Sequence, residues 1–249
     1  MRSPGSPPPS GNGRVAAPVD YELKFLLAEP VAGEIEAWAR DRLAVDRHAD
    51  PALGRQYRTT TLYLDTPALD VLHALPGFRR RKYRLRRYGR EPRLYLERKI
   101  RRGDAVRKRR VAVPEEALAT LAGGEAAHGG AEGDAWFRSE IAQRTLGPAA
   151  TITYLRTAFE GGDGPGPRRL TLDRAIRGAR TRDWKVATPD PGLELGEGVV
   201  ICELKFRGAL PAPFRDLIAA FKLKPAAASK YRRLMRAALG AAGGSVADG

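Results

Sequence analysis

The sequence has few of the residues that form disulfides or histidine metal sites. Its single cysteine, Cys202, excludes an intramolecular disulfide and fits a reducing compartment. Cys202 lies on the apolar face of a predicted strand, so we expect a buried side chain and not a nucleophile. The three histidines, His48, His73 and His128, are too far apart for metal-ligand spacing, and we expect all of them at the surface.

Long apolar segments are also missing. No stretch approaches the roughly 18 apolar residues that a membrane-spanning helix needs. The first residues, Met1 to Ser6, carry no apolar segment of the secretory type, and the glycines of 161–166 do not form a Gly-x-x-x-x-Gly-Lys phosphate loop. The single cysteine, the lack of a membrane-spanning segment and the lack of a secretory segment together predict a cytoplasmic protein.

Acidic residues are in short supply, and the deficit is local. The chain has 44 Lys and Arg against 29 Asp and Glu, a formal charge of +15. Residues 79–110 hold 17 basic and three acidic side chains, a net of +14, so the rest of the chain is nearly neutral. A concentrated positive charge of this kind points to an anionic partner.

Composition divides the chain into three parts. Residues 1–18 are rich in Pro, Gly and Ser and are expected to be disordered, and residues 240–249 are expected to form a flexible tail. Between them, residues 19–239 predict one domain, with loops at 123–133, 161–167 and 188–198.

Within that domain, apolar and polar residues mostly alternate with the period of strands. Strands are predicted at 19–27, 56–65, 79–88, 93–101, 105–113, 150–160, 168–175 and 199–207, with an extra one at 180–187. Helices are predicted at 31–43, 67–75, 114–122, 134–146, 211–222 and 229–239. These elements predict an α+β fold: a closed antiparallel β-tunnel of about eight strands with helices packed outside.

The polar faces of these strands carry charges in a repeated pattern. Glu-x-Lys occurs three times, as Glu22/Lys24, Glu97/Lys99 and Glu203/Lys205, and 82–86 places Lys82, Arg84 and Arg86 on one face. A single strand of this type is equally well explained by a face in water. The repetition, and the helices available to cover the apolar faces, favour a sheet curled around its charges.

Such an interior would be costly without an anion. Two like charges about 6 Å apart repel by roughly 3 kcal/mol at an effective dielectric near 20. A polyanion would neutralise the excess, and Arg suits bidentate contacts to phosphate. The few Glu residues are best explained as ligands for a hard divalent cation, Mg²⁺ or Mn²⁺, between carboxylates and phosphate oxygens.

Several segments together resemble a known family. They are Tyr21-Glu22-Leu23-Lys24-Phe25, Leu62-Tyr63-Leu64-Asp65-Thr66, Lys82-Tyr83-Arg84-Leu85-Arg86, Leu96-Glu97-Arg98-Lys99, Lys108-Arg109-Arg110, Tyr154-Leu155-Arg156-Thr157-Ala158-Phe159, Arg169-Leu170-Thr171-Leu172-Asp173, Cys202-Glu203-Leu204-Lys205-Phe206 and Ser229-Lys230-Tyr231. Each is weak alone, but their order and spacing resemble the triphosphate tunnel metalloenzymes, a CYTH-like superfamily, and within it the VTC domain of polyphosphate polymerases.

The resemblance implies roles for individual residues. Those implied to hold phosphate and act in catalysis are Lys24, Arg84, Arg86, Lys99, Arg156, Arg169, Lys205 and Lys230. Those implied to bind substrate are Lys82, Lys108, Arg110, Tyr63, Tyr154 and Ser229, with Arg109 in place of a neighbour if the strand bulges. Glu203 is the implied main metal ligand, while Glu22 and Glu97 either bind metal or orient neighbouring cations.

The resemblance also implies an activity. A VTC-like chain would be a metal-dependent phosphotransferase that moves the terminal phosphate of a nucleoside triphosphate, with ATP the expected donor, onto a growing polyphosphate. A membrane-protein partner for export of the polymer would fit that role.

Other functions remain open from sequence. Hydrolases of the superfamily begin with Glu-x-Glu-x-Lys, and this chain reads Asp20-Tyr21-Glu22-Leu23-Lys24; we favour Asp20 as an exposed strand-start residue over a second metal ligand. A triphosphate or tripolyphosphate hydrolase and a non-enzymatic polyphosphate-binding module are therefore the alternatives. Nucleic-acid binding through 79–81 and 101–102 is disfavoured, because the charges alternate with apolar residues.

Overall fold

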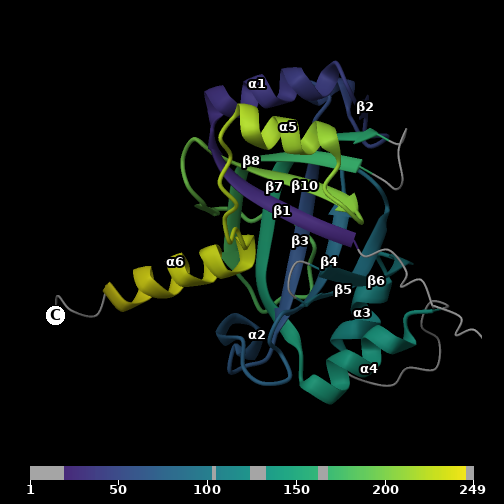
Figure 1. Ribbon diagram of the computed structural model, residues 1–249. Coiled ribbons are helices and arrows are strands. Elements are labelled where there is room, and N and C mark those ends of the chain that lie inside the picture. Colours follow the sequence, from purple (N-terminus) through teal and green to yellow (C-terminus); the bar gives the residue numbers. More distant parts are fainter. Residues whose placement is uncertain (1–19, 103–104, 124–132, 162–167, 245–249) are drawn as a thin grey trace, which may run out of the picture.

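The computed structural model describes residues 20–102, 105–123, 133–161 and 168–244 (Figure 1). The expected disordered segment 1–18, most of two loops (123–133 and 161–167) and His128 lie outside these residues. The strands are β1 (Asp20–Ala28), β2 (Ala44–Val45), β3 (Tyr57–Asp65), β4 (Arg81–Tyr88), β5 (Arg93–Arg102), β6 (Ala105–Pro114), β7 (Gly147–Gly161), β8 (Arg168–Arg180), β9 (Leu193–Glu194) and β10 (Val199–Arg207). The helices are α1 (Glu29–Arg40), α2 (Asp70–His73), α3 (Ala117–Ala122), α4 (Ala135–Arg144), α5 (Ala212–Ala220) and α6 (Lys230–Gly244), with a 3₁₀ turn at Pro51–Leu53.

Eight of the strands close into a ring. Their order is β7-β3-β4-β5-β6-β1-β10-β8, and β8 pairs back with β7, all in antiparallel register. The two-residue strands β2 and β9 attach to β7 and β8 outside this ring. The β1–β6 junction is the shortest, with Asp20 opposite Val106 and Tyr21 opposite Ala105. The predicted closed α+β tunnel is confirmed.

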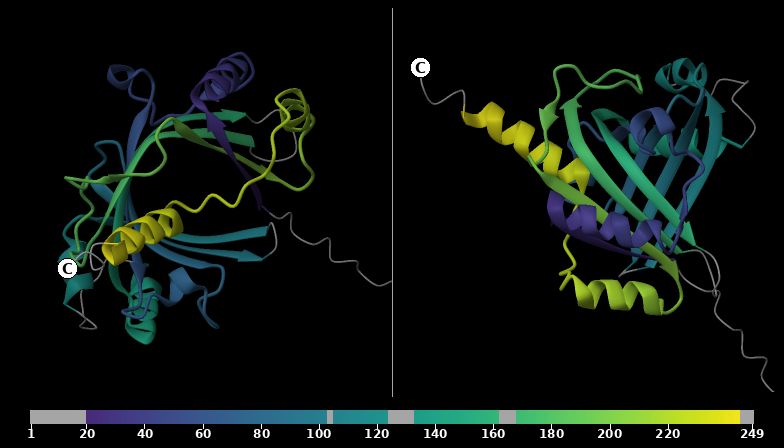
Figure 2. Two further views of the ribbon diagram at one scale, coloured as in Figure 1. Left: turned by 90° about the vertical axis from the view of Figure 1, so that its left-hand side faces the viewer. Right: turned by 90° about the horizontal axis from the view of Figure 1, so that it is seen from above.

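The helices lie outside the ring because the strands alternate (Figures 1 and 2). On one side α1 and α5 cover β1, β8 and β10, where Phe25, Leu204 and Phe214 are almost fully buried. On the other, Tyr83 and Leu85 of β4 face a second core that includes α3, α4 and α6. Every second residue of these strands therefore points into the ring, which places charged side chains inside.

Asp65, at the end of β3, ties two helices to the ring. Its Oδ1 accepts from the backbone N–H of Val71 at 2.8 Å, and its Oδ2 accepts from the Leu72 N–H at 2.9 Å and from the Tyr231 hydroxyl at 2.5 Å. Burial, followed by the hydrogen bond to Asp65, raises the pKa of Tyr231. This carboxylate fixes the start of α6, the helix that crosses one end of the tunnel (Figure 2).

The eight long predicted strands and six helices are all present, with shifted ends. The extra strand at 180–187 was wrong: β8 ends at Arg180, and the following residues to 187 form no strand. The short strands β2 and β9 were not predicted, and α6 continues to Gly244, past the expected start of the tail. Among the described residues, no helix is both long and apolar enough to cross a membrane.

Candidate functional site

The inner walls meet in a narrow centre of about 40 Å³, little more room than a few water molecules need. Eight basic side chains, two carboxylates and two tyrosines line it: Lys24, Lys82, Arg84, Arg86, Lys99, Arg156, Lys205, Lys230, Glu22, Glu203, Tyr63 and Tyr154. The structure brings together all of these predicted residues, from six strands and α6. Their roles toward a ligand stay predictions.

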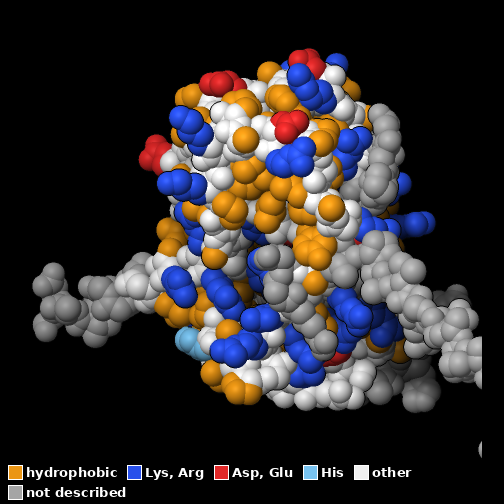
Figure 3. Space-filling model, viewed as in Figure 1, with side chains coloured by type: hydrophobic (Ala, Val, Ile, Leu, Met, Phe, Trp, Pro, Cys, Tyr) orange, Lys and Arg blue, Asp and Glu red, His pale blue; other side chains and the backbone are white. Residues whose placement is uncertain are grey.

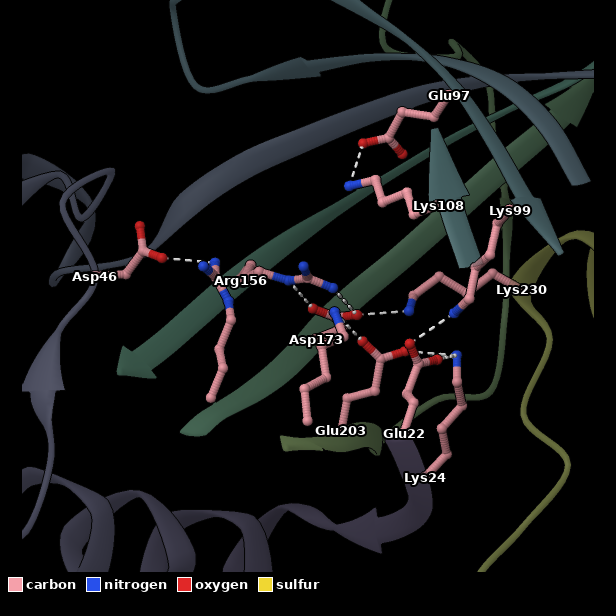
Figure 4. Close-up of polar contacts among 12 residues, drawn as sticks. Glu22, Lys24, Asp46, Glu97, Lys99, Lys108, Arg156, Asp173, Glu203 and Lys230 are labelled. Atoms are coloured by element: carbon pink, nitrogen blue, oxygen red, sulfur yellow. Dashed lines mark hydrogen bonds and ion pairs between the residues drawn. The ribbon is translucent and has the colours of Figure 1, made fainter. Parts of the chain in front are cut away.

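Glu22 and Glu203 converge on one ammonium group. The β1–β10 register places Lys24 opposite Glu203 and Glu22 opposite Lys205. Lys24 Nζ lies 2.5 Å from Glu203 and 3.1 Å from Glu22, and each carboxylate reaches a second lysine, Lys205 or Lys99 (Figure 4). Burial and the neighbouring Glu203 would raise the pKa of Glu22, but the surrounding lysines lower it to about 2.

Asp173 is a buried acid that we did not predict as a site residue. Its carboxylate accepts two hydrogen bonds from Arg156, at 2.6 and 2.8 Å, and one from Lys230 Nζ at 2.5 Å. Burial alone would raise the pKa of Asp173, but Arg156 and Lys230 hold it at about 2. A signal existed, because Asp173 shares a strand face with Arg169 four residues earlier.

Glu97 belongs to the opposite wall. It accepts a 2.6 Å hydrogen bond from Arg84 and forms a 2.6 Å ion pair with Lys108, with Arg110 at 3.6 Å. In Figure 4 the Glu97–Lys108 pair lies apart from Glu22 and Glu203. Glu97 therefore orients cations on its own wall, and the structure does not place it with the two converging carboxylates.

The β5–β6 register determines which basic side chains of β6 point into the tunnel. It runs without a bulge from Arg93 to Arg102, which turns Lys108 and Arg110 inward. Arg109 points outward, with its guanidinium carbon 4.5 Å from the centre of the Trp136 ring. Lys108 and Arg110, and not Arg109, are thus the residues available to the tunnel.

Two tyrosines support the central cations. Tyr154 lies beneath two of them, its ring centre 5.2 Å from the Arg156 guanidinium carbon and 4.6 Å from Lys230 Nζ. Tyr63 stacks on Tyr231 with ring centres 5.2 Å apart. Burial would raise the pKa of Tyr63, but Arg84 and other nearby cations lower it. Both tyrosine rings therefore pack against the cationic side chains of the centre.

One opening, which we call the aromatic mouth, is a cavity of about 490 Å³ bordered by His48, Tyr88 and Arg169. Arg169 lies here and not at the centre. It forms ion pairs with Asp46, at 2.5 Å, and with Glu160, and it donates a hydrogen bond to the Tyr57 hydroxyl at 3.0 Å. Asp46 carried no sequence signal, since it follows a strand of two residues.

His48 corrects a second expectation. Its side chain is only 18% exposed, and its ring stacks on Tyr88 with centres 5.3 Å apart and an angle of 16°. It is therefore part of the aromatic mouth and not a surface residue. His73 is exposed, as expected.

The other opening, the basic mouth, measures about 450 Å³. Its charged and polar lining is Glu22, Lys24, Arg79, Arg80, Arg81, Lys82, Lys99, Arg101, Ser229, Arg232, Arg233 and Arg236. Lys82 donates to Ser229 Oγ at 2.9 Å, which joins β4 to the start of α6. Burial and the surrounding Lys24 and Lys99 lower the pKa of Lys82 well below its usual value. Figure 3 shows Lys and Arg gathered below the layer formed by α1 and α5.

The carboxylates of Glu22 and Glu203 fit a hard divalent cation whose remaining ligands come from substrate phosphates. Among the described residues, no three His, Cys, Asp or Glu side chains come together as a metal site. Glu22 and Glu203 nevertheless converge on the Lys24 ammonium, so a cation between them would replace one positive charge with another. Mg²⁺ is commonly held in proteins by one or two carboxylates together with substrate phosphates.

The ring of eight strands and its charged interior define a triphosphate tunnel fold of the CYTH-like type. The family model for the VTC domain matches residues 19–239, and the chain belongs to this family. No curated protein matches the sequence significantly.

Solved structures share the fold at low sequence identity. A candidate adenylate cyclase from Bacillus halodurans is 13% identical with a TM-score of 0.50, over 85% of this chain and 94% of that one. A candidate adenylyl cyclase from Hippeastrum, described as having a dominant triphosphatase activity, is 12% identical with a TM-score of 0.51, over 88% and 96%. These likenesses establish the fold alone.

Proposed function

We propose that this chain is a metal-dependent polyphosphate polymerase that transfers the terminal phosphate of a nucleoside triphosphate, with ATP as donor, to a polyphosphate. The observation that carries the proposal is the continuity of the tunnel. Glu22 and Lys99 border the centre and both mouths, so the three cavities adjoin one another and cations line each of them. A closed pocket would suit a short triphosphate, whereas a path open at both ends suits a chain that grows.

The residues present are sufficient for phosphoryl transfer without a side-chain nucleophile. The attacking atom is an oxygen of the acceptor's terminal phosphate, so the protein must position two phosphate chains and stabilise charge. Arg84, Arg86 and Arg156 suit the donor phosphates because they are fixed by Glu97, Thr61 and Asp173. Fixed cations in a site that excludes water stabilise developing charge strongly.

A divalent cation at Glu22 and Glu203 would supply further charge stabilisation on the phosphate oxygens. The lysines of this wall then have to rearrange, because Lys24 occupies the space between the carboxylates. Both Mn²⁺ and Mg²⁺ suit oxygen ligands. Delivery of the polymer to a membrane-protein partner stays a prediction.

Hydrolysis of a triphosphate on the same fold is the second candidate. The cations at the centre would hold tripolyphosphate as well as a nucleotide. The structure offers little support for a paired acid on β1. Asp20 borders the aromatic mouth together with Glu22, but it is more than half exposed and pairs with Arg207 at 2.8 Å, whereas Glu22 pairs with Lys24 and Lys99. A non-enzymatic polyphosphate-binding module would use the same tunnel without turnover.

The test is incubation with ATP and Mn²⁺, with nucleotides and polyphosphate resolved by gel and chromatography. The proposal predicts ADP together with polyphosphate that lengthens with time. Lys205→Ala removes a cation from the centre and should abolish both products, whereas Lys224→Ala, an exposed lysine after α5, should change neither. Absence of both ADP and polyphosphate in the wild type would overturn the proposal.

A further inference from the structure

The two mouths of the tunnel differ in chemistry. The aromatic mouth is bordered by four rings, those of Tyr21, His48, Tyr88 and Phe206. The basic mouth has no aromatic side chain among the described residues that line it. A linear polyphosphate presents the same groups at both ends, so it gives no reason for this difference. A nucleotide does, because only one end of it carries a base.

Two rings of the aromatic mouth, those of His48 and Tyr88, belong to a connected group of rings inside the tunnel. Tyr88 contacts three neighbours, with ring centres 5.3 Å from His48, 5.5 Å from Tyr95 and 6.2 Å from Tyr57. Arg110 lies over the Tyr95 ring, with its guanidinium carbon 3.5 Å from the ring centre. Stacked aromatic and guanidinium planes are the surfaces on which bases bind without regard to sequence.

His48 is held so that the plane of its ring is fixed. Its Nδ1 lies 2.8 Å from a Glu91 oxygen, and its Nε2 accepts a long hydrogen bond from Arg47 at 3.5 Å. Its face rests on Tyr88, and the ring still borders the cavity. A fixed and partly exposed ring can stack on a ligand without first losing conformational freedom.

The position along the strand also fits a nucleotide. Tyr88 follows Arg86 and Arg84 on the inward face of β4, and each step of two residues advances about 6.6 Å. A base beside Tyr88 and His48 would therefore direct its phosphates toward the two arginines and the centre.

We propose that the aromatic mouth binds the base of the donor nucleotide, so that the triphosphate enters from this side and the polyphosphate occupies the basic mouth. This inference rests on the proposed use of a nucleoside triphosphate. It names His48 as a specificity-determining residue that discriminates nucleotides from inorganic tripolyphosphate.

The test compares two ligands by calorimetry on the full chain with Mn²⁺: the β,γ-imido analogue of ATP, and tripolyphosphate. His48→Ala should weaken binding of the nucleotide analogue about five- to thirtyfold through loss of stacking. The affinity for tripolyphosphate should stay within about twofold of the wild-type value. His48→Phe keeps a ring and should restore nucleotide binding. His73→Ala, an exposed histidine on α2, should change neither ligand.

A spectroscopic readout needs no variant. Fluorescence of 2-aminopurine riboside triphosphate should be quenched when it binds the wild type and recover when excess ATP displaces it. Equal weakening of both ligands by His48→Ala, no weakening of either, or binding without quenching would overturn the base site while leaving a phosphate tunnel intact. If the wild type bound neither ligand, the proposed function itself would fail.

Discussion

Lys230 Nζ and Asp173 Oδ2 lie 2.5 Å apart at the centre of the tunnel, where α6 meets β8. Arg156 binds the same carboxylate, so one buried acid holds two of the cations assigned to phosphate. Asp173→Asn would leave both cations without their partner. We expect the unliganded protein to lose on the order of 3 kcal/mol of unfolding free energy, measured by urea denaturation.

Tripolyphosphate should recover much of that loss, because it would neutralise the released cations. Asp183→Asn, at an exposed aspartate, serves as the control and should be neutral. The pKa of Asp173 is lowered to about 2, so its contribution in the wild type is present above the unfolded value near 4 and is lost as the pH falls through 2. An unchanged unfolding free energy for Asp173→Asn at pH 7 would contradict this account.

Tyr231→Phe tests the anchor of α6. The substitution removes the 2.5 Å hydrogen bond to Asp65 and leaves a buried carboxylate oxygen with one donor fewer. We expect a loss of about 1–3 kcal/mol in unfolding free energy. Because Lys230 is the preceding residue, KM for the nucleotide should also rise. A loss of stability with no change in KM would show that the anchor is purely structural.

Lys82 should take up a proton when phosphate binds. Its pKa is lowered by burial and by the cations around it, so a bound polyanion would raise that pKa again. Calorimetry of tripolyphosphate at pH 8 in buffers of different ionisation enthalpy should show net proton uptake, and Lys82→Met should reduce it. In the unliganded protein, the same shift makes stability rise with pH between the lowered pKa and the usual value near 10.4. Uptake that is identical in wild type and Lys82→Met would contradict this assignment.

Substitution of the β10 carboxylate, Glu203, should reduce turnover far more than substitution of Asp20. Glu203→Gln keeps the shape of the side chain but removes the charge that a divalent cation needs, and we expect turnover to fall about 100-fold. Asp20→Asn breaks an exposed pair with Arg207 at the border of the aromatic mouth, outside the centre, so polymerisation should be nearly unchanged. Steady-state rates across a Mn²⁺ titration measure both. A large loss in Asp20→Asn would instead favour the hydrolase candidate.

The strands and their inward faces could be predicted because alternation is a local property. Glu22, Lys24, Glu203 and Lys205 were placed on inward faces by period two alone, and the structure brings them together. Their pairing across β1 and β10 joins residues about 180 positions apart, which no local pattern specifies.

The missed residues have specific physical reasons. Asp173 shares a strand face with Arg169, but it is a single acid outside the repeated Glu-x-Lys pattern, so the alternation alone did not single it out. Asp46 and His48 lie just after the two-residue strand β2, whose position depends on pairing with β7. The difference between the two mouths arises from strand order, so it could be seen only once the ring was closed.

The fate of the terminal phosphate tests the central claim most directly. Wild-type protein is incubated with Mn²⁺ and ATP labelled in that phosphate, and the label is separated into free phosphate and polyphosphate. The account predicts that most of the label enters polyphosphate in step with ADP formation. Label that appears as free phosphate in step with ADP from the earliest times would contradict polymerisation and identify a hydrolase.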